Sequence, residues 1–451
     1  MASALPLLLL SAATTCSRTG ASSSTDPGGR WAQKEFLISY CGGPMNTTQQ
    51  NLNGRGLLYS ATLWRQIKAA NFTATNNYGF VDEWAMQLST AREAQLPMMI
   101  ALNRVTPPHA NASLFPPSYP SNFSSLPWPP KGDPMVLGYW LADEPAEQLF
   151  EPYAEAAEQI GAHQPGALRW VNLLPSYATP TQTGFASYSQ YLQTFAALFA
   201  RRNVLDALSI DFYPNFAPNA AKSAASPVAW LQNIALLRQV ALQHDVPWWS
   251  FVKARAIFPS DREPTAAETS WQAFTSIAYG AKGLLHFTYN TALVDARGKA
   301  TPHYWSTRAL NSRLLALGPT LLRLRSTHVN SATQGIGYAR TPGGLVANVS
   351  GDAFDRLTIG EFTHTDGRTA AIVCNDDVGR SASPRVDFSM NQVVEVDQYS
   401  GEAVALGSMG WFGMVNNDDG LGGEGPPYNR LYLGPGEGRL FLGAAYRATK
   451  A

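Results

Sequence analysis

Residues 135–145 read Met135-Val-Leu-Gly-Tyr-Trp-Leu-Ala-Asp-Glu-Pro145, an apolar run that ends in two adjacent acids and a proline. A run this apolar predicts a strand that is buried on both faces, as in a parallel sheet. Proline is tolerated in the first turn of a helix, and an amphipathic segment follows at residues 147–161. We therefore expect Asp143 and Glu144 at the carboxyl end of a buried strand, just where a helix begins. In a purely structural interpretation, one acid would cap that helix and the other would bind an arginine.

The chain repeats this strand-then-helix pattern from residue 35 to residue 325. Strand-like apolar runs lie at residues 35–40, 72–78, 97–103, 135–143, 168–174, 205–213, 247–255 and 283–289. Amphipathic stretches with helical spacing lie at residues 58–70, 81–95, 147–161, 188–201, 228–244, 266–282 and 305–325. This alternation predicts an α/β fold, the (β/α)8 TIM barrel. A doubly wound sheet is the alternative, but it usually has fewer units, and no glycine-rich phosphate loop follows the first strand.

After residue 326 the pattern changes to short β-like runs separated by turn residues. Examples lie at residues 357–362, 369–374 and 392–396, and no helical period is present. This pattern predicts a small antiparallel β-sandwich. We thus expect a signal peptide and flexible leader at residues 1–29, a barrel at 30–325 and a β-sandwich at 326–451.

The composition and the N-terminus bear on partners and location. The chain has 33 basic and 33 acidic residues, so its charge gives no reason to expect nucleic acid or an anionic membrane surface as a partner. A short apolar run followed by small residues at the N-terminus is typical of a secretory signal, and no other stretch is long enough to span a bilayer. We expect a secreted, extracellular protein with no membrane contact beyond the cleaved signal.

Sequons and cysteines are consistent with secretion. If Cys16 leaves with the signal, Cys41 and Cys374 remain and could pair, although nothing resembles a disulfide framework or a zinc site. Asparagine-X-Ser/Thr sequons that would make the chain a glycoprotein occur at Asn46, Asn71, Asn111, Asn122 and Asn348.

Polar side chains recur where the predicted strands end, and the carboxyl ends of barrel strands form the active-site face. Amides, tyrosines and acids dominate, which suits a neutral polyhydroxylated ligand, whereas a phosphate ligand would need more cations and a glycine-rich loop. The 12 Trp, 18 Tyr and 20 Phe residues suit stacking against sugar rings, or equally a large core. The spacing of acids and histidines suggests no metal site. The predicted substrate-binding residues are Tyr40, Asn77, Asn103, Asp143, Asn172, Tyr213, Lys253, Arg255 and Tyr289.

Cleavage of a glycosidic bond needs two carboxyl groups astride the bond. Glu144 is the best general acid, because burial beside Trp140 and Asp143 would raise its pKa. Asp211 is the best general base or nucleophile, and its structural alternative is an acid that orients an arginine or a substrate hydroxyl. The fourth and sixth strands are not neighbours, so we expect the two carboxyl groups to lie far apart. A separation of roughly 6.5–9.5 Å is typical of inverting glycosidases, whereas about 5 Å is typical of retaining ones.

Other acids have weaker claims to a role in the reaction. Loop residues that follow the seventh strand, Glu263 and Glu268, could instead supply the second carboxylate. The glutamates that lie at helical spacing are expected to form a solvated face; they are Glu147, Glu151, Glu155 and Glu158.

Two segments resemble barrel glycoside hydrolases related to the family 42 β-galactosidases. They are Gly138-Tyr-Trp-Leu-Ala-Asp-Glu-Pro145, and Tyr279-Gly-Ala-Lys-Gly283 leading into His286-Phe-Thr-Tyr289. The resemblance covers residues 35–325 and implies a glutamate acid/base at the end of the fourth strand, where Glu144 stands. It departs from the family at Asp143, where an asparagine is usual. It departs again in the seventh strand, residues 248–255, which lacks the glutamate nucleophile that the family implies.

These observations predict a secreted glycoside hydrolase that cleaves O-glycosidic bonds of an oligo- or polysaccharide and needs no cofactor. A non-catalytic glycan-binding protein on a degenerate barrel is the main alternative, since the seventh strand lacks its glutamate. A lyase or isomerase that uses Lys253 as a Schiff-base or proton-transfer group is a third possibility, and it would require a lysine with a lowered pKa.

Overall fold

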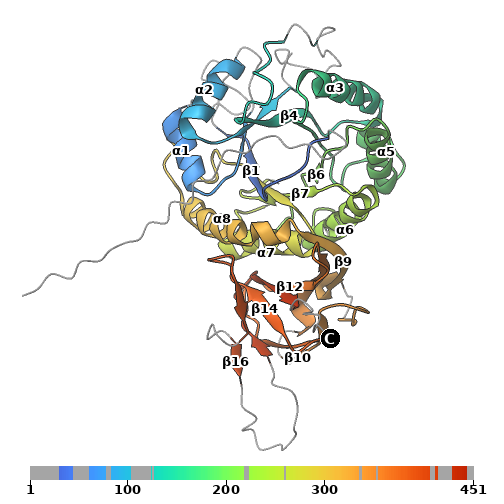
Figure 1. Cartoon of the computed structure of the whole chain (residues 1–451), viewed down its shortest axis with the longest axis vertical. Helices are drawn as coiled ribbons and strands as arrows, with labels where there is room; N and C mark the ends of the chain where they lie inside the picture. The colour runs from blue at the N-terminus through green and yellow to red at the C-terminus, as the bar shows by residue number, and fades with distance from the viewer. Residues whose placement is uncertain are drawn as a thin grey trace, which may run out of the picture.

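The computed structural model describes residues 30–43, 60–77, 83–102, 123, 126–217, 223–257, 261–334, 338–351, 354–406, 412–414 and 429–443. Figure 1 shows two parts: strands enclosed by a ring of helices, and a smaller all-β part packed against helices α7 and α8. Among the described helices, none combines the length and the apolar character needed to cross a membrane.

The first part is a barrel of eight parallel strands. Its strands are β1 (Leu37–Cys41), β2 (Thr75–Asn77), β3 (Met98–Ala101), β4 (Val136–Asp143), β5 (Leu168–Asn172), β6 (Leu208–Ile210), β7 (Trp248–Lys253) and β8 (Gly283–Phe287). They pair in the orders β1-β8-β7-β6 and β2-β3-β4-β5. A parallel bridge between Leu173 and Ile210 joins β5 to β6, and the Thr73 N–H donates to the Ile38 carbonyl (2.8 Å) between β1 and β2. The predicted (β/α)8 barrel is confirmed.

Helices surround the strands, and all of those in the described part of the barrel except α2 and α3 begin at a residue whose side chain caps the helix. They are α1 (Ala61–Ala69), α2 (Trp84–Ala94), α3 (Phe150–His163), α4 (Pro180–Thr183), α5 (Tyr188–Arg201), α6 (Pro227–His244), α7 (Ala266–Ala278) and α8 (Pro302–Leu321). Ser60, Ser187 and Ser226 each accept a backbone N–H of the first turn of the helix that follows.

The helix expected directly after Glu144 begins later than predicted. A short 3-10 turn at Glu147–Leu149 precedes α3, whose N-cap Leu149 makes no side-chain capping bond. Glu144 has φ +53° and Ala146 is extended, so the chain turns before the helix can start. Neither acid caps the helix, and that structural interpretation was wrong.

Large aromatic side chains fill the barrel interior. The Trp170 ring lies 5.5 Å from that of Trp140 and 5.7 Å from that of Trp249. At the amino ends of the strands, Trp31 packs edge-on against Trp249 (6.1 Å), whose indole N–H donates to Gln33 Oε1 (3.0 Å). The residues that precede β1 therefore close this end of the barrel.

The second part is an antiparallel sandwich, as predicted. Its strands are β9 (Leu324–Ser331), β10 (Val346–Gly351), β11 (Leu357–His364), β12 (Thr369–Asn375), β13 (Pro384–Phe388), β14 (Val393–Val396), β15 (Ala403–Ala405), β16 (Phe412–Met414), β17 (Asn429–Leu431) and β18 (Gly438–Gly443). One sheet has the order β15-β14-β18-β12-β11-β9 and the other β10-β13-β17-β16. Two-residue alternation gives the larger sheet two apolar faces: Ile359 and Val373 belong to the sandwich core, whereas Ile372 belongs to the core shared with the barrel.

Polar contacts join the sandwich to the barrel. Trp271 Nε1 of α7 donates to Asp376 Oδ1 (3.2 Å), and Arg313 of α8 forms an ion pair with Glu437 (2.9 Å). Cys374 Sγ donates to the Phe274 carbonyl (3.3 Å). Cys374 and Cys41 are both free and buried, so the pairing that we considered from the sequence is not formed.

Gly360 sets the approach of β11 to α7. A Cβ atom at this position would lie 2.0 Å from the carbonyl oxygen of Ala278. We expect Gly360→Ala to lower the free energy of unfolding by about 1–3 kcal/mol, the usual cost of overpacking. Urea denaturation tests this, with Gly379→Ala as the control, because a Cβ there would meet only Asp377 Oδ1 at 3.5 Å. Equal stability of the two variants would contradict the close approach.

Glu361 of β11 makes the stability of the sandwich depend on pH. Its carboxylate accepts the N–H groups of Leu345 (2.8 Å) and Val346 (3.1 Å), but burial outweighs these bonds and raises its pKa to about 7. Because the folded pKa exceeds the unfolded one, this group's contribution is fully present below pH about 4 and is lost as the pH rises through about 7. Between pH about 4 and pH about 7, we expect the free energy of unfolding of the parent to fall by about 3 kcal/mol more than that of Glu361→Gln, as measured by urea denaturation. Parallel pH profiles would contradict this.

Candidate active site

Glu144 and Asp211 meet at the carboxyl ends of the strands. Glu144 follows β4 and Asp211 follows β6, and their side chains hydrogen-bond each other. This contact is shorter than either separation typical of glycosidases, so the wide separation expected from the strand order is not present. The two predicted catalytic acids are therefore brought together.

A network of hydrogen bonds holds this pair. Asn172, at the end of β5, donates from Nδ2 to Asp143 Oδ1 (3.0 Å) and hydrogen-bonds Asp211. Its Oδ1 accepts the hydroxyl of Ser209 (2.8 Å), and its carbonyl accepts the N–H of Glu144 (2.9 Å). Asn172 thus connects the ends of β4, β5 and β6.

Both catalytic candidates have raised pKa values. Burial is the main cause for Glu144. For Asp211 burial again comes first, followed by the negative charges of Glu144 and Asp143, and its pKa lies well above the ordinary range. Two carboxyl groups that share a hydrogen bond cannot readily both ionise, so the pair favours the state in which one proton is shared.

Tyrosines that the sequence analysis missed surround the pair. Tyr177, in the loop after β5, hydrogen-bonds the backbone of Tyr213, and burial, followed by the charges of Asp211 and Glu144, raises its pKa. Tyr191 of α5 donates to the Pro145 carbonyl (2.9 Å) and accepts the Leu174 N–H (3.2 Å), which fixes the chain just after Glu144. An aromatic residue just after a strand tip was the only signal for Tyr177.

Tyr213 lies at the site, whereas two other predicted tyrosines do not. Burial raises the pKa of Tyr213, and the charges of Asp211 and Asp143 raise it further. The Tyr213 ring packs on Phe287 (5.0 Å). Tyr40 and Tyr289 are fully buried and lie 5.2 Å apart in the core shared with the helices. They point out of the barrel, so their assignment to a sugar subsite is corrected.

Lys253 is a structural residue rather than a substrate ligand. Its fully buried Nζ lies 2.5 Å from Asp261 Oδ2 and donates to the Pro214 carbonyl (3.0 Å). Burial lowers its pKa, but the Asp261 carboxylate opposes that shift. A lysine held in this way is poorly placed for the Schiff base of the lyase or isomerase alternative.

The other predicted ligands are placed only in part. Arg255 donates to Thr291 Oγ1 (3.0 Å) and to the Ala256 carbonyl (3.2 Å). Asn77 ends β2 and pairs with Ile100 of β3, and Asn103 lies outside the described residues. Most of the proline- and serine-rich loop at residues 106–134 also lies outside them.

The alternative acids have structural positions. Glu268 belongs to the capping box of α7 and binds Arg262 through both oxygens (2.5 and 2.7 Å), and Glu263 is exposed. Arg202 binds Glu151 (2.6 Å) and Glu158 (3.1 Å) on the outer surface. Over the described ranges, no three or more His, Cys, Asp or Glu side chains are placed to hold a metal ion.

Comparison with known proteins supports the fold. No family model matches the sequence, and no curated protein matches it. The structure is similar to a glycoside hydrolase of family 5 from Bacteroides vulgatus, with a TM-score of 0.53, 12% identity and coverage of 94% of this chain and 93% of that chain. It also matches a β-galactosidase from Rahnella sp. with a TM-score of 0.43, 12% identity and coverage of 72% and 62%. The resemblance to barrel glycoside hydrolases is thus confirmed for the fold, which this chain shares with the family 5 protein over nearly its whole length.

Proposed function

We propose that this chain is a glycoside hydrolase that cleaves O-glycosidic bonds of an oligo- or polysaccharide. The observation that carries the proposal is the contact between Glu144 and Asp211, two acids from different strands, at the face of the barrel where active sites lie. Glycoside hydrolysis requires one protonated and one ionised carboxyl group in the same site. A pair that shares one proton supplies both forms at once.

Glu144 is assigned as the general acid and Asp211 as the general base or nucleophile. In the described structure, the bond to Asp211 is the only hydrogen bond of the Glu144 side chain. Rotation of Glu144 therefore breaks a single bond and makes room for a glycosidic oxygen between the two acids. We take the contact as a resting arrangement that opens when sugar binds.

Polar groups next to the pair supply sugar subsites in this proposal. Asp143 and Asn172 lie in the same network, and Tyr213 and Tyr177 bring aromatic rings close to the acids. The proposal also keeps three substrate ligands that were predicted from the sequence alone: Asn77, Asn103 and Arg255. No cofactor is required for this chemistry.

Secretion is part of the proposal and rests on the N-terminal sequence. Asn348 is an exposed sequon residue, as a glycosylated site in a secreted protein must be. N-terminal sequencing of the protein recovered from culture medium tests this, and the account expects a start after Cys16, within the leader that ends at residue 29. Retention inside the cell with an intact residue 1 would contradict it.

The test of function uses purified protein and a panel of plant and algal polysaccharides. Release of reducing ends is followed over time, and binding to the same polysaccharides is followed by affinity electrophoresis. The proposal expects turnover of at least one member. Binding without turnover across the panel would favour the glycan-binding alternative.

A further inference from the structure

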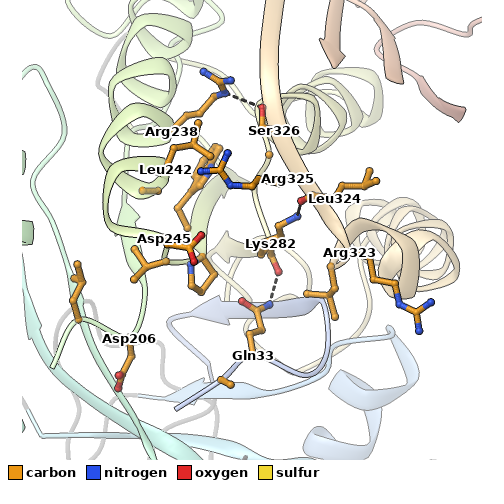
Figure 2. Close-up of a pocket in the computed structure, with 18 of the residues that line it drawn as sticks. Gln33, Asp206, Arg238, Leu242, Asp245, Lys282, Arg323, Leu324, Arg325 and Ser326 are labelled. Carbon is orange, nitrogen blue, oxygen red and sulfur yellow. Dashed lines mark hydrogen bonds between the residues drawn. The ribbon is translucent and has the colours of Figure 1, made fainter. Parts of the chain in front are cut away.

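Figure 2 shows a cavity whose lining residues include several that precede barrel strands, whereas Glu144 and Asp211 follow strands and so lie at the other end of the barrel. Its volume is about 350 Å³, within the range of small-molecule sites. Its walls include Gln33, Asp206 and Lys282, which precede strands β1, β6 and β8, together with Ser326 of β9. The cavity therefore lies between the amino ends of the barrel strands and the start of the sandwich.

Positive charge exceeds negative charge in this cavity. Its basic lining residues are Arg30, Arg238, Lys282, Arg323 and Arg325, and its acidic ones are Asp206 and Asp245. Asp206 is buried and already paired with Arg169 (2.7 Å). Asp245 is exposed. Within the described ranges, Arg238 and Arg325 form no ion pair with any carboxylate.

Arg238 is the central residue of the cavity. It comes from the middle of α6, is half-buried, and donates from Nε to Ser326 Oγ (2.8 Å). Its two Nη atoms have no hydrogen-bond partner among the described residues. A half-buried guanidinium with free Nη atoms can bind an oxyanion through two parallel bonds.

Helix capping explains Lys282, but not Arg238. Lys282 donates to the Leu321 carbonyl (2.5 Å) at the C-terminal end of α8, where a positive charge is favourable, and to the Leu324 carbonyl at the start of β9. Arg238 lies in a helix interior, and Arg325 lies in strand β9, so neither caps a helix. Figure 2 shows both arginines entering the cavity region from opposite sides, from α6 and from β9.

We propose that this cavity binds a compact molecule through an oxyanion group, such as a sulfate, phosphate or carboxylate, held by Arg238 and Arg325. The wall also contains the apolar residues Leu242, Val246 and Pro247, and the body of the ligand packs against them. This site is separate from the acids at the other end of the barrel and does not depend on the proposed hydrolase activity.

Titration calorimetry at constant ionic strength tests the proposal with four probes: inorganic sulfate, glucose 6-sulfate, glucuronate and neutral glucose. We expect saturable binding of at least one anionic probe and none of glucose. Binding of inorganic sulfate would identify a free anion as the ligand, and binding of only the sugar anions would identify an acidic sugar. No saturable binding of any anionic probe would overturn the proposal.

Two variants locate the site. Arg238→Gln is expected to weaken binding at least tenfold, and Arg325→Gln, at an exposed position, should weaken it without affecting folding. Arg201→Gln makes the same change of charge at an exposed position of α5 and should leave the Kd within twofold. Equal weakening by Arg201→Gln and Arg238→Gln would show only a general charge effect and would overturn the site. Glu144→Gln should leave binding unchanged, which separates this site from the proposed active site.

Discussion

Glu144→Gln is expected to lower the rate of polysaccharide cleavage at least a hundredfold. The substitution keeps the size of the side chain but removes the proton that the leaving oxygen must receive, and acid catalysis typically contributes about 10²–10⁴. Burial raises the pKa of Glu144, as this role requires, whereas the hydrogen bond from Asp211 acts in the opposite direction. The measurement is the initial rate of reducing-end release on the substrate that the parent protein cleaves best.

A matched control is available close by. Glu147 is exposed in the 3-10 turn that follows Glu144, so Glu147→Gln should leave the rate within about twofold of the parent. If Glu144→Gln also kept a rate within about threefold of the parent, the assignment of Glu144 as the acid would be wrong.

Asp211→Asn is expected to abolish activity and to raise stability at the same time. The loss of rate should be at least about a hundredfold, because the site loses its base or nucleophile. Burial and the charges of Glu144 and Asp143 hold the pKa of Asp211 far above its ordinary range. Its folded pKa exceeds its unfolded pKa, so the parent loses stability as the pH rises above about 4. The neutral asparagine avoids this loss.

The stability of Asp211→Asn is measured by urea denaturation at pH 5 and pH 8. We expect the variant to be more stable than the parent at pH 8, and the difference to shrink at pH 5, because the raised pKa of Asp211 makes its ionised form less populated at the lower pH. Stability gained where activity is lost is the pattern of a functional site. A variant that is much less stable at both pH values would instead indicate a structural acid.

The alternation of strands and helices predicted the barrel well, because buried parallel strands and amphipathic helices leave distinct patterns. Convergence of Glu144 and Asp211 on one face followed from their positions after strands. Their direct contact did not follow, because strand order says little about how far side chains reach across a barrel. A register shift between Trp140 and Ala142 re-aims the end of β4, and no sequence pattern reveals it.

Errors in the predicted subsites have a similar physical origin. Successive residues of a strand face opposite sides, so a polar residue near a strand end points into the barrel in only about half of cases. Cys41 lies in the interior cluster, and its neighbour Tyr40 therefore faces the helices. Lys253 was misassigned for another reason: its partner Asp261 lies in a loop, and loops give no pattern from which to predict such a contact.

The most direct test of the account is the dependence of the two variants on the leaving group. A dinitrophenyl glycoside of the identified sugar needs no proton to release its aglycone. On polysaccharide, both variants are expected to lose at least about a hundredfold in rate. On the dinitrophenyl glycoside, the rate of Glu144→Gln should fall less than about tenfold below that of the parent, whereas the rate of Asp211→Asn should still fall at least about a hundredfold. Equal losses of Glu144→Gln on the two substrates, or rescue of Asp211→Asn by the activated one, would contradict the proposed roles of the pair.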